Sequence, residues 1–305
     1  MSARPPGRRP AAAAEPLAAG APPSGRPPRT AVVGHVEWLD FAVVERLPAA
    51  GEIVTAADHF EAAAGGGAVA AVQLARLAGR ADFYAVVGDD ERGARAAAEL
   101  RGPLGVELHA VARAGRRQRR AFTHVDADGE RTITVLGERL VPHGEDPLPW
   151  ERLAAADAVY YTGGDAGAAA AARRARVLVA SGRAPEGLIA AGATPDVVVA
   201  SDRDEKELAG AAALPQRPRW LVLTHGTAGG RWEGADGSSG RWQAVAPPGP
   251  AIDAYGCGDS FAAGLTYGLG AGLGLERALA LAARCGAWCA TGRGPYGRQL
   301  TAAEL

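Results

Sequence analysis

The sequence predicts an α/β fold with three layers, in which a mostly parallel central sheet is flanked by helices. Short runs of β-branched residues alternate with helix-forming stretches along most of the chain, which is the pattern of parallel strands joined by helical crossovers. Of the 305 residues, 48% are hydrophobic, a normal content for the core of a globular domain. Near the middle of the chain two β-rich runs flank a short turn, so a small β substructure is expected there.

The first 29 residues differ in composition from the rest of the chain. They contain eight prolines and five arginines but almost no large apolar residue, so they cannot bury enough surface to offset the entropy lost on ordering. We therefore predict a disordered tail over residues 1–29 and one folded domain over residues 30–305.

The expected elements follow from local composition. β-Branched runs closed by glycine or polar residues predict strands, and Ala- and Leu-rich stretches with helical spacing of apolar residues predict helices. Strands are expected over residues 30–36, 83–88, 158–161, 177–179, 197–199 and 220–224. Helices are expected over residues 68–77, 92–100, 260–269 and 275–290.

A hairpin interrupts this alternation. Residues 121–125 and 131–135 are rich in β-formers and flank a five-residue turn that contains Asp-Gly, which is typical of an antiparallel pair. We expect a small β lid formed from parts of residues 35–62 and 106–136.

Charge and cysteine content exclude several classes of protein. The 33 basic and 34 acidic residues leave a net charge of −1, so the chain lacks the basic field that holds nucleic acid or an anionic membrane. No apolar run reaches the roughly 18 residues of a membrane span. Three cysteines are an odd number and cannot form a disulfide framework. These features favour a cytoplasmic protein that binds neither nucleic acid nor a membrane.

Residues 252–264 form the segment best suited to phosphate chemistry. Gly256 and Gly258 allow successive N–H groups to point into one space, and a helix expected to begin near Asp259 adds the positive end of its dipole. Beside such an anion site, the Asp259 carboxylate is suited to take a proton from a hydroxyl that attacks a phosphoryl group. The structural alternative is that Asp259 is an N-cap and the glycines form a turn.

Three further segments carry weaker signals. Residues 224–230 combine glycines with short hydroxyl side chains after a strand, and residues 65–67 are glycines before a helix. Each suits a ligand loop, but each also suits an ordinary turn or a flexible loop. The arginine run at residues 116–120 is expected to form a solvated turn, with contact to an anionic ligand as the alternative.

Taken in order, these segments resemble the ribokinase/PfkB family of carbohydrate and nucleoside kinases, from residue 30 to residue 300. The most specific match is the run from Asp253 to Phe261, which is similar to the family's D-T-x-G-A-G-D-x-F. The resemblance implies that Asp259 is the catalytic base and that Asp253 lies near a monovalent-cation site. It further implies an anion hole made by Gly256, Cys257 and Gly258.

Other family motifs occur in the same order. Residues 87–93 resemble V-G-x-D-x-x-G, and residues 129–132 resemble the G-E-R-T of the lid hairpin. The T-x-G-x-x-G nucleotide loop implies nucleotide binding by Thr224, Gly226 and Gly229. The N-x-x-E motif aligns with Ser201 to Asp204, with Ser for Asn and Asp for Glu. This match implies a nucleotide contact for Ser201 and a water-mediated Mg²⁺ contact for Asp204.

The acceptor side departs further from the family. The motif G-G-x-x-x-N-x-A implies substrate binding by Gly65, Gly66 and Gly67, but Val69 replaces its asparagine. An apolar residue there would leave a sugar hydroxyl unpaired, which favours a less polar or differently decorated acceptor. The family's early substrate-binding aspartate aligns with Leu39. A one-residue bulge would bring Asp40 into the site; otherwise the pocket does not bind ribose in the family way.

The resemblance implies an ATP-dependent phosphotransferase that acts on a hydroxyl of a sugar or sugar-like molecule. ATP and Mg²⁺ are the expected cofactors, with K⁺ as an optional ion, and the resemblance allows a homodimer formed through the lid. Two alternatives stay open: a nucleoside or vitamin-precursor kinase of the same fold, and a non-catalytic sensor that binds a metabolite.

Overall fold

The computed structural model describes residues 25–305, so most of the tail predicted over residues 1–29 lies outside the described residues. Its last residues contact the domain, because the backbone N–H of Arg29 donates to a carboxylate oxygen of Asp157 at 2.8 Å. Over the described residues, no helix is both long and apolar enough to span a bilayer.

The large sheet has nine strands in the order β13-β12-β11-β10-β9-β8-β1-β4-β5. Neighbours from β11 to β5 are parallel, and β12 and β13 add an antiparallel hairpin at one edge. The strands are β1 Thr30–Val33, β4 Asp82–Gly88, β5 Glu107–Arg113, β8 Ala158–Tyr161, β9 Leu178–Ser181, β10 Val197–Ser201, β11 Trp220–Thr224, β12 Gly230–Gly234 and β13 Ser239–Trp242.

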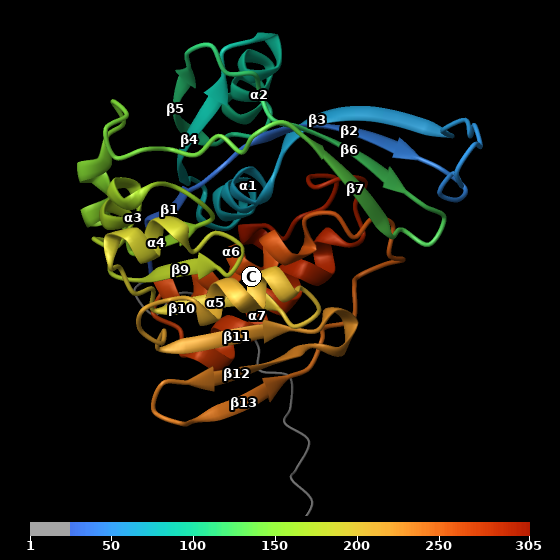
Figure 1. Cartoon of the computed structure of the whole chain (residues 1–305). Coiled ribbons are helices and arrows are strands. Elements are labelled where there is room, and N and C mark those ends of the chain that lie inside the picture. The colour runs from blue at the N-terminus through green and yellow to red at the C-terminus, as the bar shows by residue number, and fades with distance from the viewer. Residues whose placement is uncertain (1–24) are drawn as a thin grey trace, which may run out of the picture.

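Helices cover both faces of this sheet, which confirms the predicted α/β class (Figure 1). They are α1 Gly66–Ala78, α2 Glu91–Arg101, α3 Ala166–Ala172, α4 Glu186–Ala191, α5 Glu205–Ala212, α6 Cys257–Gly270 and α7 Leu275–Cys289. Val32 of β1 packs in a cluster with α1, α6 and α7, whereas Ala31 and Val33 pack on the opposite side with α3 and α4. Side chains of a strand alternate between faces, so one strand serves both cores.

A second sheet forms the predicted lid. Its order is β3-β2-β6-β7, with β2 Glu37–Val43, β3 Asp58–Ala64, β6 Arg120–Val125 and β7 Arg131–Leu136. It projects beyond the large sheet (Figure 1). The hairpin turn reaches back to the domain: the N–H of Ala254 donates to the carbonyl of Gly129 at 3.1 Å. The lid tip therefore touches the segment that the sequence singles out for phosphate chemistry.

Two boundaries differ from the predicted elements. The first strand ends at Val33, and residues 37–43 form the separate lid strand β2. Residues 107–113 form β5, which pairs in parallel with β4 in the large sheet and is not part of the lid. The cause is topological, because α2 is the crossover that returns the chain beside β4.

Candidate active site

Helix α6 begins immediately after a bend at Gly256. This residue has φ of +81°, in the left-handed region that residues with a Cβ rarely adopt. A Cβ there would lie 3.0 Å from Cγ1 of Val69 on α1, so space as well as backbone angle favours glycine. The first-turn N–H groups of Gly258 and Asp259 have no helical partner and lie at the positive end of the dipole. Around Gly258 the space is open, since a Cβ there would meet no atom within 4 Å.

The start of this helix differs from the predicted one. It begins at Cys257, before the expected start near Asp259, and its N-cap is Gly256, with no side-chain cap bond. The alternative in which Asp259 is an N-cap is therefore wrong. Within the described residues the Asp259 carboxylate has no hydrogen-bond partner, only longer-range charge interactions.

The glycine run at the start of α1 lies against Asp259. A Cβ at Gly66 would lie 2.8 Å from Oδ1 of Asp259 and 3.8 Å from Cε1 of His35. A Cβ at Gly65 would lie 3.1 Å from Cγ of Glu37. Glycine at these two positions thus lets the start of α1 lie close to the side chains of Asp259, His35 and Glu37. Two of the three, His35 and Glu37, were not predicted as site residues.

The pKa of Asp259 is raised from its ordinary value of 3.8 to about 6, mainly by burial. Arg131 on the lid and Arg183 oppose this shift, whereas the carboxylates of Glu207 and Glu37 reinforce it. A carboxylate with this pKa is largely ionised near neutral pH and more basic than an exposed aspartate, as a general base should be.

Glu37 and His35 form a buried polar pair at the base of the lid. Both are 7% exposed, and Nε2 of His35 lies 3.7 Å from Oε1 of Glu37. Burial lowers the pKa of His35 to about 3, helped by the charges of Arg139 and Arg119, so the imidazole is neutral. Burial raises the pKa of Glu37, and Arg119 and Arg139 oppose that shift.

The bulge proposed to bring Asp40 into the site is absent. Strand β2 pairs with β3 and β6 in regular register through this region. Asp40 instead shares the Trp38 side of the strand, where it accepts a hydrogen bond from Arg120 at 3.0 Å. Glu37 and Leu39 lie on the other side, because strand residues alternate in direction.

Val69, which replaces the family's asparagine, is fully buried. It packs in a cluster with Leu39, Phe41 and Tyr255, against the bend at Gly256. Its apolar side chain therefore supports the loop before α6, and its effect on the choice of acceptor stays a prediction.

The predicted nucleotide-binding residues lie together at one end of the large sheet. Ser201 ends β10 and Thr224 ends β11, and the two are direct partners in the parallel register. Gly226 and Gly229 both have positive φ in the turn that follows β11. In that turn, the N–H of His225 donates to the carbonyl of Gly229 at 2.8 Å. The carboxyl ends of parallel strands are the usual ligand edge of an open α/β sheet.

Asp204 and Glu207 lie at the start of α5, beside this edge. Asp204 is the N-cap of α5 and accepts from the N–H groups of Lys206 and Glu207 at 3.0 and 3.2 Å; it also pairs with Arg183. Glu207 accepts from the N–H of Ser201 at 2.6 Å and pairs with Arg183 at 2.8 Å. Glu207, which was not predicted, is the one of these two acids whose charge raises the pKa of Asp259.

Asp253 clamps two loops together. Its carboxylate accepts from the N–H of Tyr255 at 2.8 Å and from the N–H of Gly294 at 2.9 Å. The side chain is 3% exposed, and burial raises its pKa. Each carboxylate oxygen accepts one backbone hydrogen bond and keeps a lone pair free, so a position of Asp253 near a monovalent cation stays a prediction.

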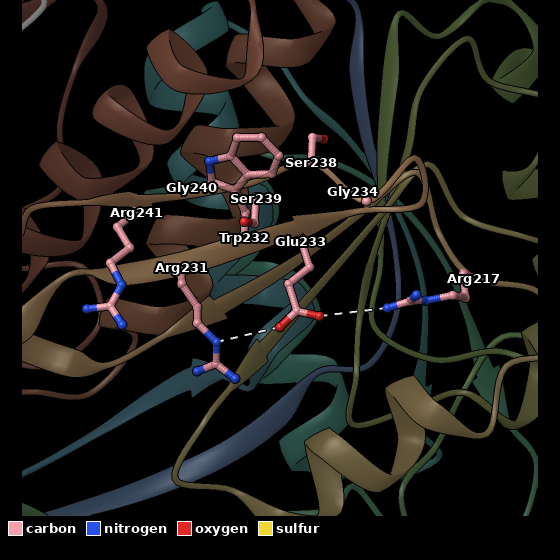
Figure 2. A pocket seen from close by; sticks show the side chains of 10 residues that line it. Arg217, Arg231, Trp232, Glu233, Gly234, Ser238, Ser239, Gly240 and Arg241 are labelled. Atoms are coloured by element: carbon pink, nitrogen blue, oxygen red, sulfur yellow. Dashed lines mark ion pairs between the residues drawn. The ribbon is translucent and has the colours of Figure 1, made fainter. Parts of the chain in front are cut away.

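A surface hollow of about 490 Å³ lies on the β12–β13 hairpin and contains none of the predicted site residues (Figure 2). Glu233 in this hollow pairs with Arg231 at 3.6 Å and with Arg217 at 3.7 Å. Such exposed pairs contribute little, and we assign the hollow no role in the site.

Comparison with known proteins shows the family to which this fold belongs. Residues 28–301 match the model of the pfkB family of carbohydrate kinases. An ATP-dependent ribose-1-phosphate kinase from Halopiger xanaduensis is 32% identical over 285 residues, covering 85% of this chain and 90% of that protein. Ribokinase from Giardia lamblia has a TM-score of 0.73 at 18% identity, covering 91% of this chain and 98% of that chain. Arabidopsis thaliana ribokinase, complexed with ribose and ATP, has a TM-score of 0.70 at 19% identity, with coverages of 91% and 97%. The chain therefore belongs to the pfkB family of carbohydrate kinases and is an enzyme of that family.

Proposed function

We propose that this kinase transfers the γ-phosphoryl group of ATP to a sugar hydroxyl, with Asp259 as the catalytic base. The observation that carries the proposal is a carboxylate with no hydrogen-bond partner in the described chain, at the N-terminal turn of a 14-residue helix. The names of the relatives support ATP as the donor and a sugar as the acceptor.

In the proposed reaction, Asp259 accepts the hydroxyl proton as the hydroxyl oxygen attacks the γ-phosphorus and the bond to ADP breaks. The N–H groups from Gly256 to Gly258 hold the charge on the phosphoryl oxygens. Fixed donors of this kind act most strongly in the transition state, because they require no reorganisation during the reaction.

The nucleotide is proposed to lie along the edge formed by Ser201, Thr224, Gly226 and Gly229. The acids at the start of α5 suit a hydrated Mg²⁺ held mainly by ATP phosphates, since this ion usually keeps several waters and takes one or two carboxylates. When bound, Mg²⁺ would neutralise phosphate charge. Asp204 and Glu207 would hold it through water, and Arg183 beside them would fix their orientation.

The lid is proposed to exclude water from the transfer. Its turn contacts the loop before α6 through Gly129 and Ala254, and Arg131 next to that turn acts on the charge of Asp259. Closure of such a lid limits hydrolysis of ATP by water. A homodimer through the lid stays a prediction, supported by the exposed apolar residues Ile133, Val135 and Leu136 on β7.

For the acceptor we propose a phosphorylated pentose, because the Halopiger relative is named for ribose 1-phosphate.

A cytoplasmic location is proposed as well, supported by three cysteines that are all free.

The proposed function is tested by ADP release from ATP and Mg²⁺ across sugars, sugar phosphates, nucleosides and vitamin precursors. We expect acceptor-dependent release with a sugar or sugar phosphate. Release only with nucleosides or vitamin precursors would favour the alternative kinase. Ligand binding in thermal-shift experiments with no release for any acceptor would favour the non-catalytic sensor.

The raised pKa of Asp259 predicts the pH dependence of the reaction. The base must be ionised, so kcat/KM should be level above about pH 7 and fall about tenfold per pH unit below pH 6. The profile is measured from pH 4.5 to 8.5 at fixed ionic strength. A rate that stays level down to pH 4.5 would show that an unperturbed carboxylate, or no carboxylate, limits the reaction.

A further inference from the structure

Two arginines of the lid region lie beside the buried Glu37. Arg119 immediately precedes β6, and its Nε lies 2.8 Å from Oε1 of Glu37, with 15% of its side chain exposed. Arg139 follows β7 and is half-buried. Both charges act on His35 and Glu37, and each lowers the pKa of His35. Two guanidinium groups therefore converge on one small region below the lid.

The N–H donors of these two guanidinium groups have few hydrogen-bond acceptors in the described part of the protein. Within residues 25–305, Arg139 forms no hydrogen bond or ion pair, and its pKa is lowered by burial and by the charge of Arg119. The Nε of Arg119 is buried without a well-directed hydrogen bond, although Glu37 is close. Each guanidinium offers five donors. Buried donors without acceptors are costly, and like charges held together add to that cost. A ligand with several negatively charged oxygens would remove both penalties.

Arg183 is the third arginine near this region, but two carboxylates already neutralise its charge. It pairs with Asp204 and Glu207 at the start of α5. Its position links it to the nucleotide side of the site. Arg119 and Arg139 belong to the lid side. Arg119 pairs with Glu37, whereas Arg139 interacts with Glu37 and Glu186 only through longer-range charge within the described residues.

The position of the arginine pair relative to Asp259 defines what kind of ligand fits. Asp259 lies against Gly66 and near His35; His35 lies beside Glu37, and Glu37 lies beside Arg119. A molecule that places a hydroxyl at Asp259 can thus extend along His35 toward the arginines. It must carry its anionic group at the end opposite the reacting hydroxyl.

We propose that Arg119 and Arg139 form an anion subsite that binds the phosphate already present on the acceptor, so that the substrate class is a sugar monophosphate. This inference rests on the proposed function. Guanidinium groups suit this task because their planar fork matches the geometry of phosphate oxygens.

The test compares Arg139→Gln with Arg116→Gln. Arg116 belongs to the same arginine run, but its side chain is exposed, and within the described residues its only ion pair is with the exposed Glu138 at 3.1 Å. For both variants and the wild type, KM is measured for ribose 1-phosphate, for ribose and for ATP. Calorimetry gives the Kd of ribose 1-phosphate without ATP. Arg119→Lys is a third variant. It keeps the positive charge beside Glu37 but loses the planar set of guanidinium N–H donors.

We expect Arg139→Gln to raise both KM and Kd for ribose 1-phosphate by about 10- to 100-fold, the range of a lost charged hydrogen bond. The KM values for ATP and ribose should stay within about twofold, and Arg116→Gln should match the wild type. Arg119→Lys should show a smaller loss of the same kind. An equal loss for ribose, or a matching rise in KM for ATP, would overturn the subsite.

The two proposals fail separately. If the wild type binds ribose 1-phosphate in an Arg139-dependent way but releases ADP with no sugar or sugar phosphate, the proposed function is wrong and the subsite stands. If the wild type phosphorylates sugars and Arg139→Gln binds ribose 1-phosphate like the wild type, the subsite is wrong and the function stands.

Discussion

Replacing Asp259 with asparagine is expected to lower kcat about 10³-fold while leaving KM for ATP nearly unchanged. Asparagine keeps the size of the side chain but cannot accept the hydroxyl proton, and general-base catalysis contributes about 10²- to 10⁴-fold. The measurement is steady-state ADP release with the best acceptor at pH 7.5.

The same variant should be more stable than the wild type, and only at higher pH. The pKa of Asp259 is about 6 in the folded protein, against 3.8 ordinarily. Ionisation of this carboxylate therefore destabilises the folded protein as the pH rises from about 4 to about 6. Below about pH 4 the group is protonated in both states and has no effect on stability. Asparagine removes this penalty, so the free energy of unfolding should rise by about 3 kcal/mol at pH 8 and not at pH 4. Urea denaturation at both pH values measures the difference.

Asp40→Asn is the matched control for Asp259→Asn. Asp40 lies on the Trp38 side of β2 and pairs with Arg120, so we expect kcat and the acceptor KM to change less than about twofold. A large rise in the acceptor KM would restore the substrate-binding role that the sequence suggests for Asp40. A kcat for Asp259→Asn within about tenfold of the wild type would remove Asp259 as the base.

Replacing Gly256 with alanine is expected to have the second-largest effect on activity. Its φ of +81° is unfavourable for alanine, and the new Cβ would lie 3.0 Å from Val69. To relieve this strain, the first turn of α6 must shift, and with it the N–H groups proposed to stabilise the transition state. Removing one such donor costs about 10²- to 10³-fold, so a partial displacement should lower kcat about 10- to 100-fold.

The matched control is Gly272→Ala, just after α6. Gly272 has φ of +83°, but a Cβ there would meet no atom within 4 Å. Both variants should lose stability, by about 1 to 2 kcal/mol from the left-handed backbone alone, whereas only Gly256→Ala should lose activity. Kinetics and thermal unfolding of the two proteins check this together. Equal activity in both would show that the bend at Gly256 has no role in catalysis.

The predicted fold class is confirmed because its signals are local. Parallel strands that are buried on both faces appear as continuous runs of apolar residues, and residues 158–161 and 197–199 are examples. Helices α3, α4 and α5 were not predicted, since each has only six to eight residues, too few to display a helical period. Asp165 and Asp204 cap two of them through hydrogen bonds, which composition alone does not reveal.

The candidate site likewise contains residues that the local sequence identifies and residues whose roles only the tertiary structure reveals. Gly256, Gly258 and Asp259 could be selected from the sequence, because the glycine bend, the start of the helix and the proposed base all lie within residues 256–259. The roles of His35, Glu37, Arg119 and Arg139 arise from strand pairing and loop packing between segments far apart in the chain. Burial and neighbouring charges set the pKa of Asp259 and leave Arg139 without a hydrogen bond or ion pair among residues 25–305. They exist only after those segments meet, so no local pattern could have predicted them.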